Sequence, residues 1–169
     1  MNKLFENIIR ISFAFIIIAI AGCKSSRYSC EPDLYVLNVL SKSLYDECHI
    51  KGSRHVSFDK LEEFAKSLDK NAEIVIYCSD YMCSASGLGC KKLIDMGFTK
   101  VYAYEGGMAE WYQNGFPVEG SCTKSKPHSN SYLVKTNPKP LLDEKTSYPT
   151  ISAQELRDKI EKAHCGCGC

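Results

Sequence analysis

The sequence predicts an α/β fold: an open, mainly parallel sheet flanked by helices. Short apolar runs at 35–40, 73–78 and 101–104 have the composition of buried strands. Segments with helical spacing follow these runs, and strands that alternate with helices form parallel sheets. The 169 residues accommodate one such domain with appendages, and 21 Lys+Arg against 20 Asp+Glu leave no broad basic surface for nucleic acid.

The first 22 residues are expected to be a signal peptide. Basic residues precede an apolar run over 11–21, which is too short for a comfortable transmembrane helix. The sequence Ile-Ala-Gly-Cys at 20–23 resembles the lipobox of bacterial lipoproteins, which implies cleavage before Cys23 and lipid on its sulfur. We therefore expect a cell-envelope protein that is lipid-anchored to a bacterial membrane, with residues 23–30 as a tether. The alternative is an ordinary secreted protein with an incidental cysteine at the cut site.

The folded domain is expected to span residues 31–121. Its elements in chain order are a strand at 35–40, helical spacing over 58–68, a strand at 73–78, a helix over 84–96, a strand at 101–104 and a helix over 108–113. Gly97 stands where the helix over 84–96 would stop.

A linker and a short helix are expected after the domain. Prolines recur among Lys, Ser, Thr and Asn over 122–150, which is typical of a linker. Ser152 and Glu155 then form a capping-box pattern, in which each side chain accepts a backbone N–H of the other residue. The helix would run to about residue 164, before a Cys-Gly-Cys-Gly-Cys tail at 165–169.

The order of several short motifs resembles the rhodanese family. The motifs are the strand at 35–40, His49-Ile50-Lys51-Gly52-Ser53, the strand that ends in Cys78, Met96-Gly97-Phe98, Val101-Tyr102, Glu105-Gly106-Gly107, Trp111 and Gly115-Phe116-Pro117-Val118. The resemblance implies an open α/β sheet whose reactive cysteine follows the central strand, and Cys78 stands at that position. The helix after Ser152 also resembles the opening helix of such a domain, and its docking would bring the tail near Cys78.

The position of Cys78 favours thiolate chemistry. Backbone N–H groups and the positive end of a helix dipole converge where a strand leads through a loop into a helix, and both stabilise a thiolate or a persulfide. The expected substrate loop is Ser79, Asp80, Tyr81, Met82, Cys83 and Ser84, with the main-chain amides of the first five as a cradle. The resemblance implies double displacement, in which the thiolate takes a sulfane sulfur from a donor and passes it to a thiol acceptor, with no cofactor required.

Departures from the family pattern affect the expected substrate. Active rhodaneses commonly carry an Arg near the position of Cys83, which suits an anionic donor such as thiosulfate. This loop has no Arg or Lys, and Asp80 adds a negative charge. Asn38 and Leu40 stand where the family commonly has Asp and Arg. The sequence therefore leaves open an alternative function, a non-catalytic thiol-rich module that binds a soft metal ion or a partner protein.

Cys83 provides a second thiol in the same loop. We hypothesise that it resolves a persulfide or sulfenate on Cys78 as a reversible disulfide. The alternative is that Cys83 is only a small residue that closes the loop.

The other cysteines have several interpretations. Cys30 and Cys122 flank the domain, and domain ends often lie close together, so the sequence allows a disulfide between them. Cys48 and Cys90 are interpreted as packing thiols. The tail residues that can bind Cu(I) or receive sulfur are His164, Cys165, Cys167 and Cys169. Random disulfides at a frayed end are the alternative for this tail.

Overall fold

The computed structural model describes residues 34–128, 131–135 and 147–165, which belong to one compact unit. The predictions for the signal peptide, the lipid on Cys23, the tether and Cys30 fall outside the described residues, as do those for Cys167 and Cys169. Within the described ranges, none of the helices combines the length and apolar character that a membrane span requires.

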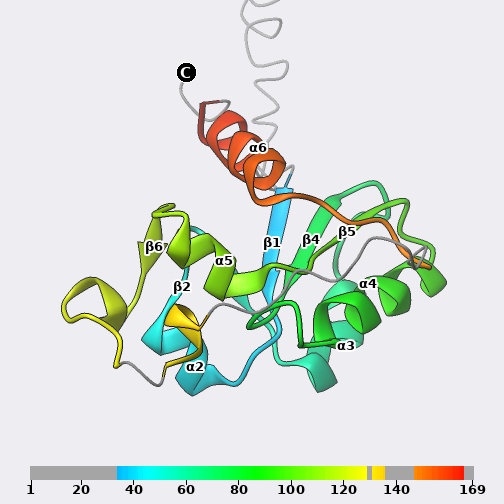
Figure 1. Cartoon of the computed structure of the whole chain (residues 1–169). Helices are drawn as coiled ribbons and strands as arrows, with labels where there is room; N and C mark the ends of the chain where they lie inside the picture. The colour runs from blue at the N-terminus through cyan, green and yellow to red at the C-terminus, as the bar shows by residue number, and fades with distance from the viewer. Residues whose placement is uncertain (1–33, 129–130, 136–146, 166–169) are drawn as a thin grey trace, which may run out of the picture. The chain divides into compact units, whose positions relative to one another are not determined.

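A four-stranded parallel sheet forms the centre of the unit (Figure 1). Its strands, in spatial order, are β3 (Arg54–His55), β1 (Leu34–Asn38), β4 (Glu73–Tyr77) and β5 (Lys100–Tyr104). The three longer strands are the predicted apolar runs, so the parallel α/β sheet is confirmed. Asn38, Tyr77 and Tyr104 are aligned in register, and their strands therefore end level at one edge.

Helices and short strands lie between the strands of this sheet and after its last strand, β5. In chain order they are α2 (Lys42–Glu47), β2 (His49–Ile50), η2 (Phe58–Lys60), α3 (Leu61–Ala65), α4 (Ala85–Asp95), α5 (Gly107–Gln113), β6 (Val118–Glu119), η3 (Ser121–Thr123), η4 (Tyr132–Val134) and α6 (Ala153–Cys165). The predicted helices over 84–96 and 108–113 are confirmed as α4 and α5. Strands β2 and β6 pair antiparallel as a separate two-stranded sheet.

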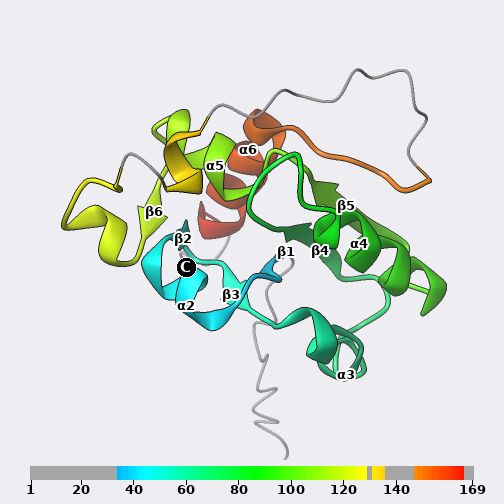
Figure 2. The same cartoon turned by 60° about the horizontal axis from the view of Figure 1, so that its bottom comes forward.

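Alternating side chains of the central strands supply two apolar cores, one on each face of the sheet. In β4, Ile74 and Ile76 pack with residues of α3 and α4, whereas Val75 and Tyr77 pack with residues of α5 and α6. Figure 2 shows the two groups of helices on different sides of the sheet. All four of these β4 side chains are fully buried, so their alternation determines which helices cover each face.

The C-terminal segment completes the domain. Thr150 forms a parallel bridge with Ala103 of β5 and thereby extends the sheet at that edge. Helix α6 then buries Leu156 completely in the second core. Its start has the predicted capping box, since the Ser152 N–H donates to the Glu155 carboxylate at 3.0 Å and the Glu155 N–H donates to the Ser152 hydroxyl at 3.3 Å.

Parts of the predicted linker over 122–150 are also packed on the domain. Leu133 of η4 is fully buried, and the Gln113 side chain of α5 donates to the carbonyls of Leu133 and Lys135 at 3.1 and 2.9 Å. The polar, proline-rich composition did not reveal this docking, because it depends on one apolar side chain and a few hydrogen bonds to the backbone. The domain therefore extends beyond the predicted end at residue 121.

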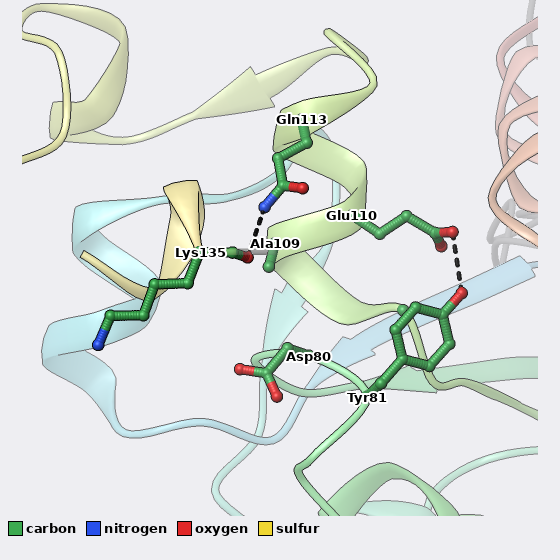
Figure 3. A pocket seen from close by; sticks show the side chains of 7 residues that line it. Asp80, Tyr81, Ala109, Glu110, Gln113 and Lys135 are labelled. Carbon is green, nitrogen blue, oxygen red and sulfur yellow. Dashed lines mark hydrogen bonds between the residues drawn. The ribbon is translucent and has the colours of Figure 1, made fainter. Parts of the chain in front are cut away.

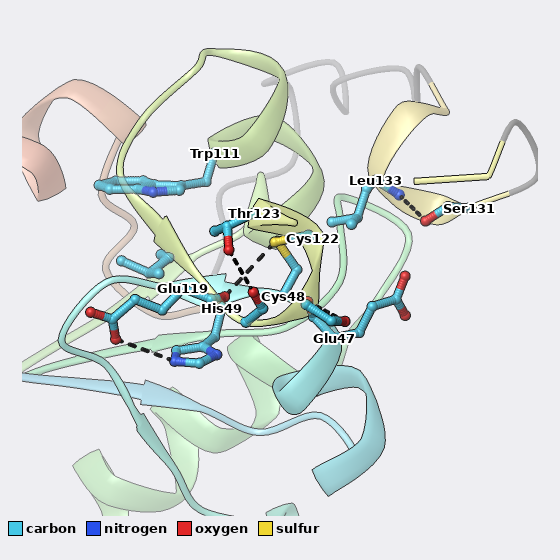
Figure 4. The surroundings of a disulfide bond; sticks show 12 residues. Glu47, Cys48, His49, Trp111, Glu119, Cys122, Thr123, Ser131 and Leu133 are labelled. Atoms are coloured by element: carbon cyan, nitrogen blue, oxygen red, sulfur yellow. Dashed lines mark hydrogen bonds and ion pairs between the residues drawn. A yellow bond between two sulfur atoms is a disulfide. The ribbon is translucent and has the colours of Figure 1, made fainter. Parts of the chain in front are cut away.

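A disulfide joins Cys48 to Cys122, with Cα atoms 5.4 Å apart and a sequence separation of 74 (Figure 4). Cys122 can form only one such bond, so the pairing with Cys30 is wrong, and so is the packing role given to Cys48. The antiparallel β2–β6 pair explains the observed bond, since it sets His49 opposite Glu119 and brings the two cysteines together.

Candidate active site

The loop that follows β4 begins with Cys78 and ends where α4 starts at Ala85. Strand β4 is an inner strand of the sheet, so Cys78 occupies the position that the sequence predicted. Its side chain is 0% exposed, and it belongs to the core that α3 and α4 cover. The loop therefore holds a buried thiol at the edge where the parallel strands end.

The amino end of α5 packs against the backbone of this loop. The Met108 N–H donates to the Cys78 carbonyl at 3.0 Å, and the Ala109 N–H donates to the Ser79 carbonyl at 2.9 Å. Gly107 has a φ of +60°, and a Cβ atom there would lie 2.7 Å from the Asp80 nitrogen and the Cys78 carbonyl oxygen. Only glycine combines this backbone conformation with so close an approach.

Asp80 organises the turn inside the loop. Its carboxylate accepts the Met82 N–H at 2.8 Å, and its carbonyl accepts the Cys83 N–H at 3.1 Å. The Asp80 side chain is largely buried. Two of the five amides predicted to cradle an anion are thus already bonded to Asp80, so the predicted cradle is only partly open.

The loop brings the two predicted catalytic thiols, Cys78 and Cys83, into hydrogen-bond contact. Both are free cysteines. The Cys78 sulfur lies 3.1 Å from the Cys83 carbonyl oxygen and 3.6 Å from the Ser86 hydroxyl oxygen. The Cys83 sulfur accepts hydrogen bonds from the backbone N–H groups of Ala85 and Ser79.

These surroundings move the pKa values of the two thiols in opposite directions. The hydrogen bond from Cys78 lowers the pKa of Cys83, and the N–H groups of Ala85 and Ser79 add to this effect. The same hydrogen bond, together with burial, raises the pKa of Cys78. Donors to a thiolate favour its charged form, whereas burial disfavours it. The surroundings therefore favour the thiolate form of Cys83 over that of Cys78.

Comparison with known proteins identifies the family. The family model for the rhodanese-like domain matches residues 26–114, more than half of the chain. The chain belongs to the rhodanese-like domain family. Thiosulfate sulfurtransferase GlpE of Coxiella burnetii is 32% identical over 79 residues, which are 47% of this chain and 72% of that protein. GlpE of Pseudomonas fluorescens is 27% identical over 96 residues, which are 57% of this chain and 85% of that protein.

A solved structure agrees with this assignment. The rhodanese-like domain of the Alr3790 protein from Anabaena is 25% identical to this chain, with a TM-score of 0.50. The match covers 64% of this chain and 83% of the Anabaena domain. The predicted fold class is therefore confirmed both by the sheet itself and by a known member of the family.

Beside its cysteine loop, this rhodanese-like domain has a cavity of about 220 Å³ (Figure 3). The residues that line it are Asp80, Tyr81, Gly106, Ala109, Glu110, Gln113 and Lys135. The Tyr81 hydroxyl donates to the Glu110 carboxylate at 2.9 Å, which ties the loop to α5. The lining thus carries two carboxylates and one ammonium group, and it contains neither of the loop thiols.

Cys90 differs from the loop thiols in its surroundings. It is buried, its thiol donates to the Val101 carbonyl at 3.6 Å, and burial raises its pKa to about 12. These features agree with the predicted packing role. Among the residues that the structure describes, no group of three or more His, Cys, Asp or Glu side chains could hold a metal ion.

Helix α6 runs away from the cysteine loop. It follows Thr150, which lies beside β5, and its Lys159 pairs with Glu73 at 2.7 Å, at the start of β4. Cys78 follows the other end of β4. The docked helix therefore does not lead the tail toward Cys78, contrary to the interpretation from the sequence. The side chains of His164 and Cys165 and all of residues 166–169 lie outside the described residues.

Three residues of the site were missed by the sequence analysis: Ser86, Gly107 and Glu110. Ser86 was not distinguished from other small residues of α4, although its hydroxyl oxygen lies 3.6 Å from the Cys78 sulfur. Gly107 was considered only as part of a family motif. The two consecutive glycines, Gly106 and Gly107, could have indicated that another backbone segment approaches closely there. Glu110 gave no signal, because a carboxylate on a short helix is usually solvated.

Proposed function

We propose that this rhodanese-like domain transfers sulfur through the thiols of its β4–α4 loop. Two free cysteines in contact, Cys78 and Cys83, support the proposal, because the surroundings of Cys83 lower its pKa and so favour a thiolate. The thiolate is the nucleophilic form of cysteine, and it can take a sulfane sulfur as a persulfide. Relatives named thiosulfate sulfurtransferase support the same class of reaction.

The donor that fits the site best is a persulfide or a polysulfide. The loop has no Arg or Lys, so the dianion thiosulfate would meet no cation within it. Asp80 and Glu110 outnumber Lys135 in the lining of the adjacent cavity. A thiol acceptor then removes the sulfur and restores the pair.

Sulfur loading measured by mass spectrometry tests this function. The tryptic peptide over residues 71–91 contains Cys78, Cys83 and Cys90. Exposure of the full chain to inorganic tetrasulfide should add one sulfur to this peptide, and cyanide or glutathione should remove it. Cys90→Ser should load as the wild type does, and the double variant Cys78→Ser/Cys83→Ser should not. Equal loading of the double variant and the wild type would exclude the loop as the site.

The cell envelope is the location that we propose, with lipid on Cys23 as the anchor. The motif at 20–23 supports this location, and the disulfide between Cys48 and Cys122 is typical of an oxidising compartment. Cys23→Ser should move the protein from the membrane fraction of a bacterial host to the soluble fraction. Retention of the variant in the membrane fraction would contradict lipid anchoring at this residue.

A further inference from the structure

The two loop thiols differ in their access to solvent. Cys78 is 0% exposed, whereas Cys83 is only partly buried. A thiol must reach the sulfane sulfur of its donor in order to attack it. In this conformation of the loop, a donor from solution therefore reaches Cys83 before Cys78.

The hydrogen bonds of the two thiols also favour Cys83 as the nucleophile. The Cys78 thiol faces oxygen acceptors, the Cys83 carbonyl at 3.1 Å and the Asp80 carbonyl at 3.9 Å, and carbonyl acceptors stabilise a protonated thiol. One N–H group, that of Ser86, points to Cys78 as well. The Cys83 sulfur instead accepts from the Ala85 and Ser79 N–H groups and from the Cys78 thiol, and such donors stabilise a thiolate.

We propose that Cys83 takes the sulfur from the donor and passes it to Cys78, so that the pair acts as a relay. This inference deepens the proposed sulfur transfer and depends on it. It assigns the first nucleophilic attack to the residue that stands near the usual Arg position, and it makes Cys78 the second carrier of the sulfur. A basic residue in the loop is then unnecessary, because a persulfide or polysulfide donor needs only a thiolate.

The chemical steps balance without an external oxidant. In the first step, the Cys83 thiolate bonds to the protonated terminal sulfur of the donor, and the donor S–S bond breaks with its electron pair leaving on a thiolate or a shorter polysulfide. In the second step, the Cys78 sulfur bonds to the outer sulfur of the protonated Cys83 persulfide. The bond between that sulfur and Cys83 then breaks, and the proton of the Cys78 thiol moves to the Cys83 sulfur. The products are a Cys78 persulfide and a Cys83 thiol.

Single variants of the full chain separate this relay from direct attack by Cys78. Each is mixed with inorganic tetrasulfide, quenched with iodoacetamide at a series of times, and analysed through fragment ions of the 71–91 peptide. In the wild type, sulfur should appear on Cys83 before Cys78. Cys78→Ala and Cys78→Ser should still load sulfur on Cys83, whereas Cys83→Ser should load Cys78 roughly tenfold more slowly than the wild type does, because the accessible thiol is lost. Cys90→Ser, at a third thiol of the same peptide, serves as the matched control.

The outcomes distinguish failure of the relay from failure of sulfur transfer itself. If Cys83→Ser loads Cys78 at the wild-type rate, or if neither Cys78 variant loads Cys83, Cys78 attacks the donor directly and the relay is wrong. If the wild type takes no sulfur on either thiol, the proposed sulfur transfer is wrong and the relay falls with it.

Discussion

Gly107 controls the geometry of the cysteine loop at the level of a single residue. A methyl group at this position would lie 2.7 Å from backbone atoms of Cys78 and Asp80, so α5 or the loop would have to shift. Gly107→Ala should therefore slow sulfur loading by about a hundredfold, since a displacement of roughly 1 Å has effects of that size on reacting groups. Initial loading rates with tetrasulfide measure this effect.

Gly115→Ala is the matched control for that variant. Gly115 has a φ of +68°, close to that of Gly107, but a Cβ atom there has no heavy atom within 4 Å. Gly115→Ala should therefore lower the free energy of unfolding by only about 1–2 kcal/mol, because alanine disfavours the left-handed backbone conformation. Equal slowing of sulfur loading by both variants would show that backbone strain, not contact with the loop, is responsible.

The pH dependence of alkylation should separate the loop thiolate from the buried thiol of Cys90. The pKa of Cys83 is lowered and that of Cys90 is raised to about 12, and only thiolates react with iodoacetamide. The rate of Cys83 alkylation should therefore reach half its maximum at a pH below the ordinary cysteine value, in a range where Cys90 still does not react. A midpoint for Cys83 near the ordinary value of about 8.5 would contradict this assignment.

Removing the partner thiol tests the cause of that shift. The hydrogen bond from Cys78 is the largest contribution to the lowered pKa of Cys83. Cys78→Ala should therefore move the midpoint of Cys83 alkylation upward, toward the ordinary cysteine value. An unchanged midpoint would assign the shift to the N–H groups of Ser79 and Ala85 instead.

At the scale of elements, extended apolar patterns could be predicted from the sequence, whereas elements held by single contacts could not. Strand β4 has four consecutive buried residues, and α6 starts with a complete capping box. Helix α2 buries none of its residues, so it lacks the amphipathic pattern on which prediction depends. Strand β2 has only two residues and is defined by its pairing with β6. The disulfide partner of Cys122 depends on that same pairing and was therefore missed.

The same distinction holds for the candidate site. Cys78 and Cys83 could be predicted because motif order and spacing are properties of the sequence. The contact of α5 with the loop could not, because Gly107 meets Cys78 and Asp80 only through the tertiary fold. The burial that separates the two thiols is likewise a property of packing.

Helix α6 is expected to be an integral part of the domain. Leu156 is fully buried in the core that contains Val75 and Trp111. Leu156→Ala should lower the free energy of unfolding by about 2–5 kcal/mol, because it leaves a cavity in a packed core. Urea unfolding measures this loss, and Lys162→Ala at an exposed position of the same helix should change the midpoint little. Equal midpoints for the two variants would show that α6 is not docked in solution.

At the scale of the whole domain, the sheet separates two kinds of cysteine. The disulfide of Cys48 and Cys122 belongs to the core that α5 and α6 cover, whereas Cys78 and Cys83 pack with the core on the α3 and α4 face. The disulfide and the free loop thiols therefore lie on opposite faces of the central sheet. An alteration of one should leave the other in place as long as the domain is folded.

The disulfide should stabilise the whole domain through the loop that it closes. For a sequence separation of 74, loop-closure entropy in the unfolded chain corresponds to about 4 kcal/mol. Cys48→Ala/Cys122→Ala should lower the free energy of unfolding by about that amount, and a phosphine reductant should destabilise the wild type but not the variant. Urea unfolding of both proteins, with and without the reductant, measures each effect. If the reductant shifts the two midpoints equally, other cysteines account for its action, and the Cys48–Cys122 bond does not contribute the expected stability.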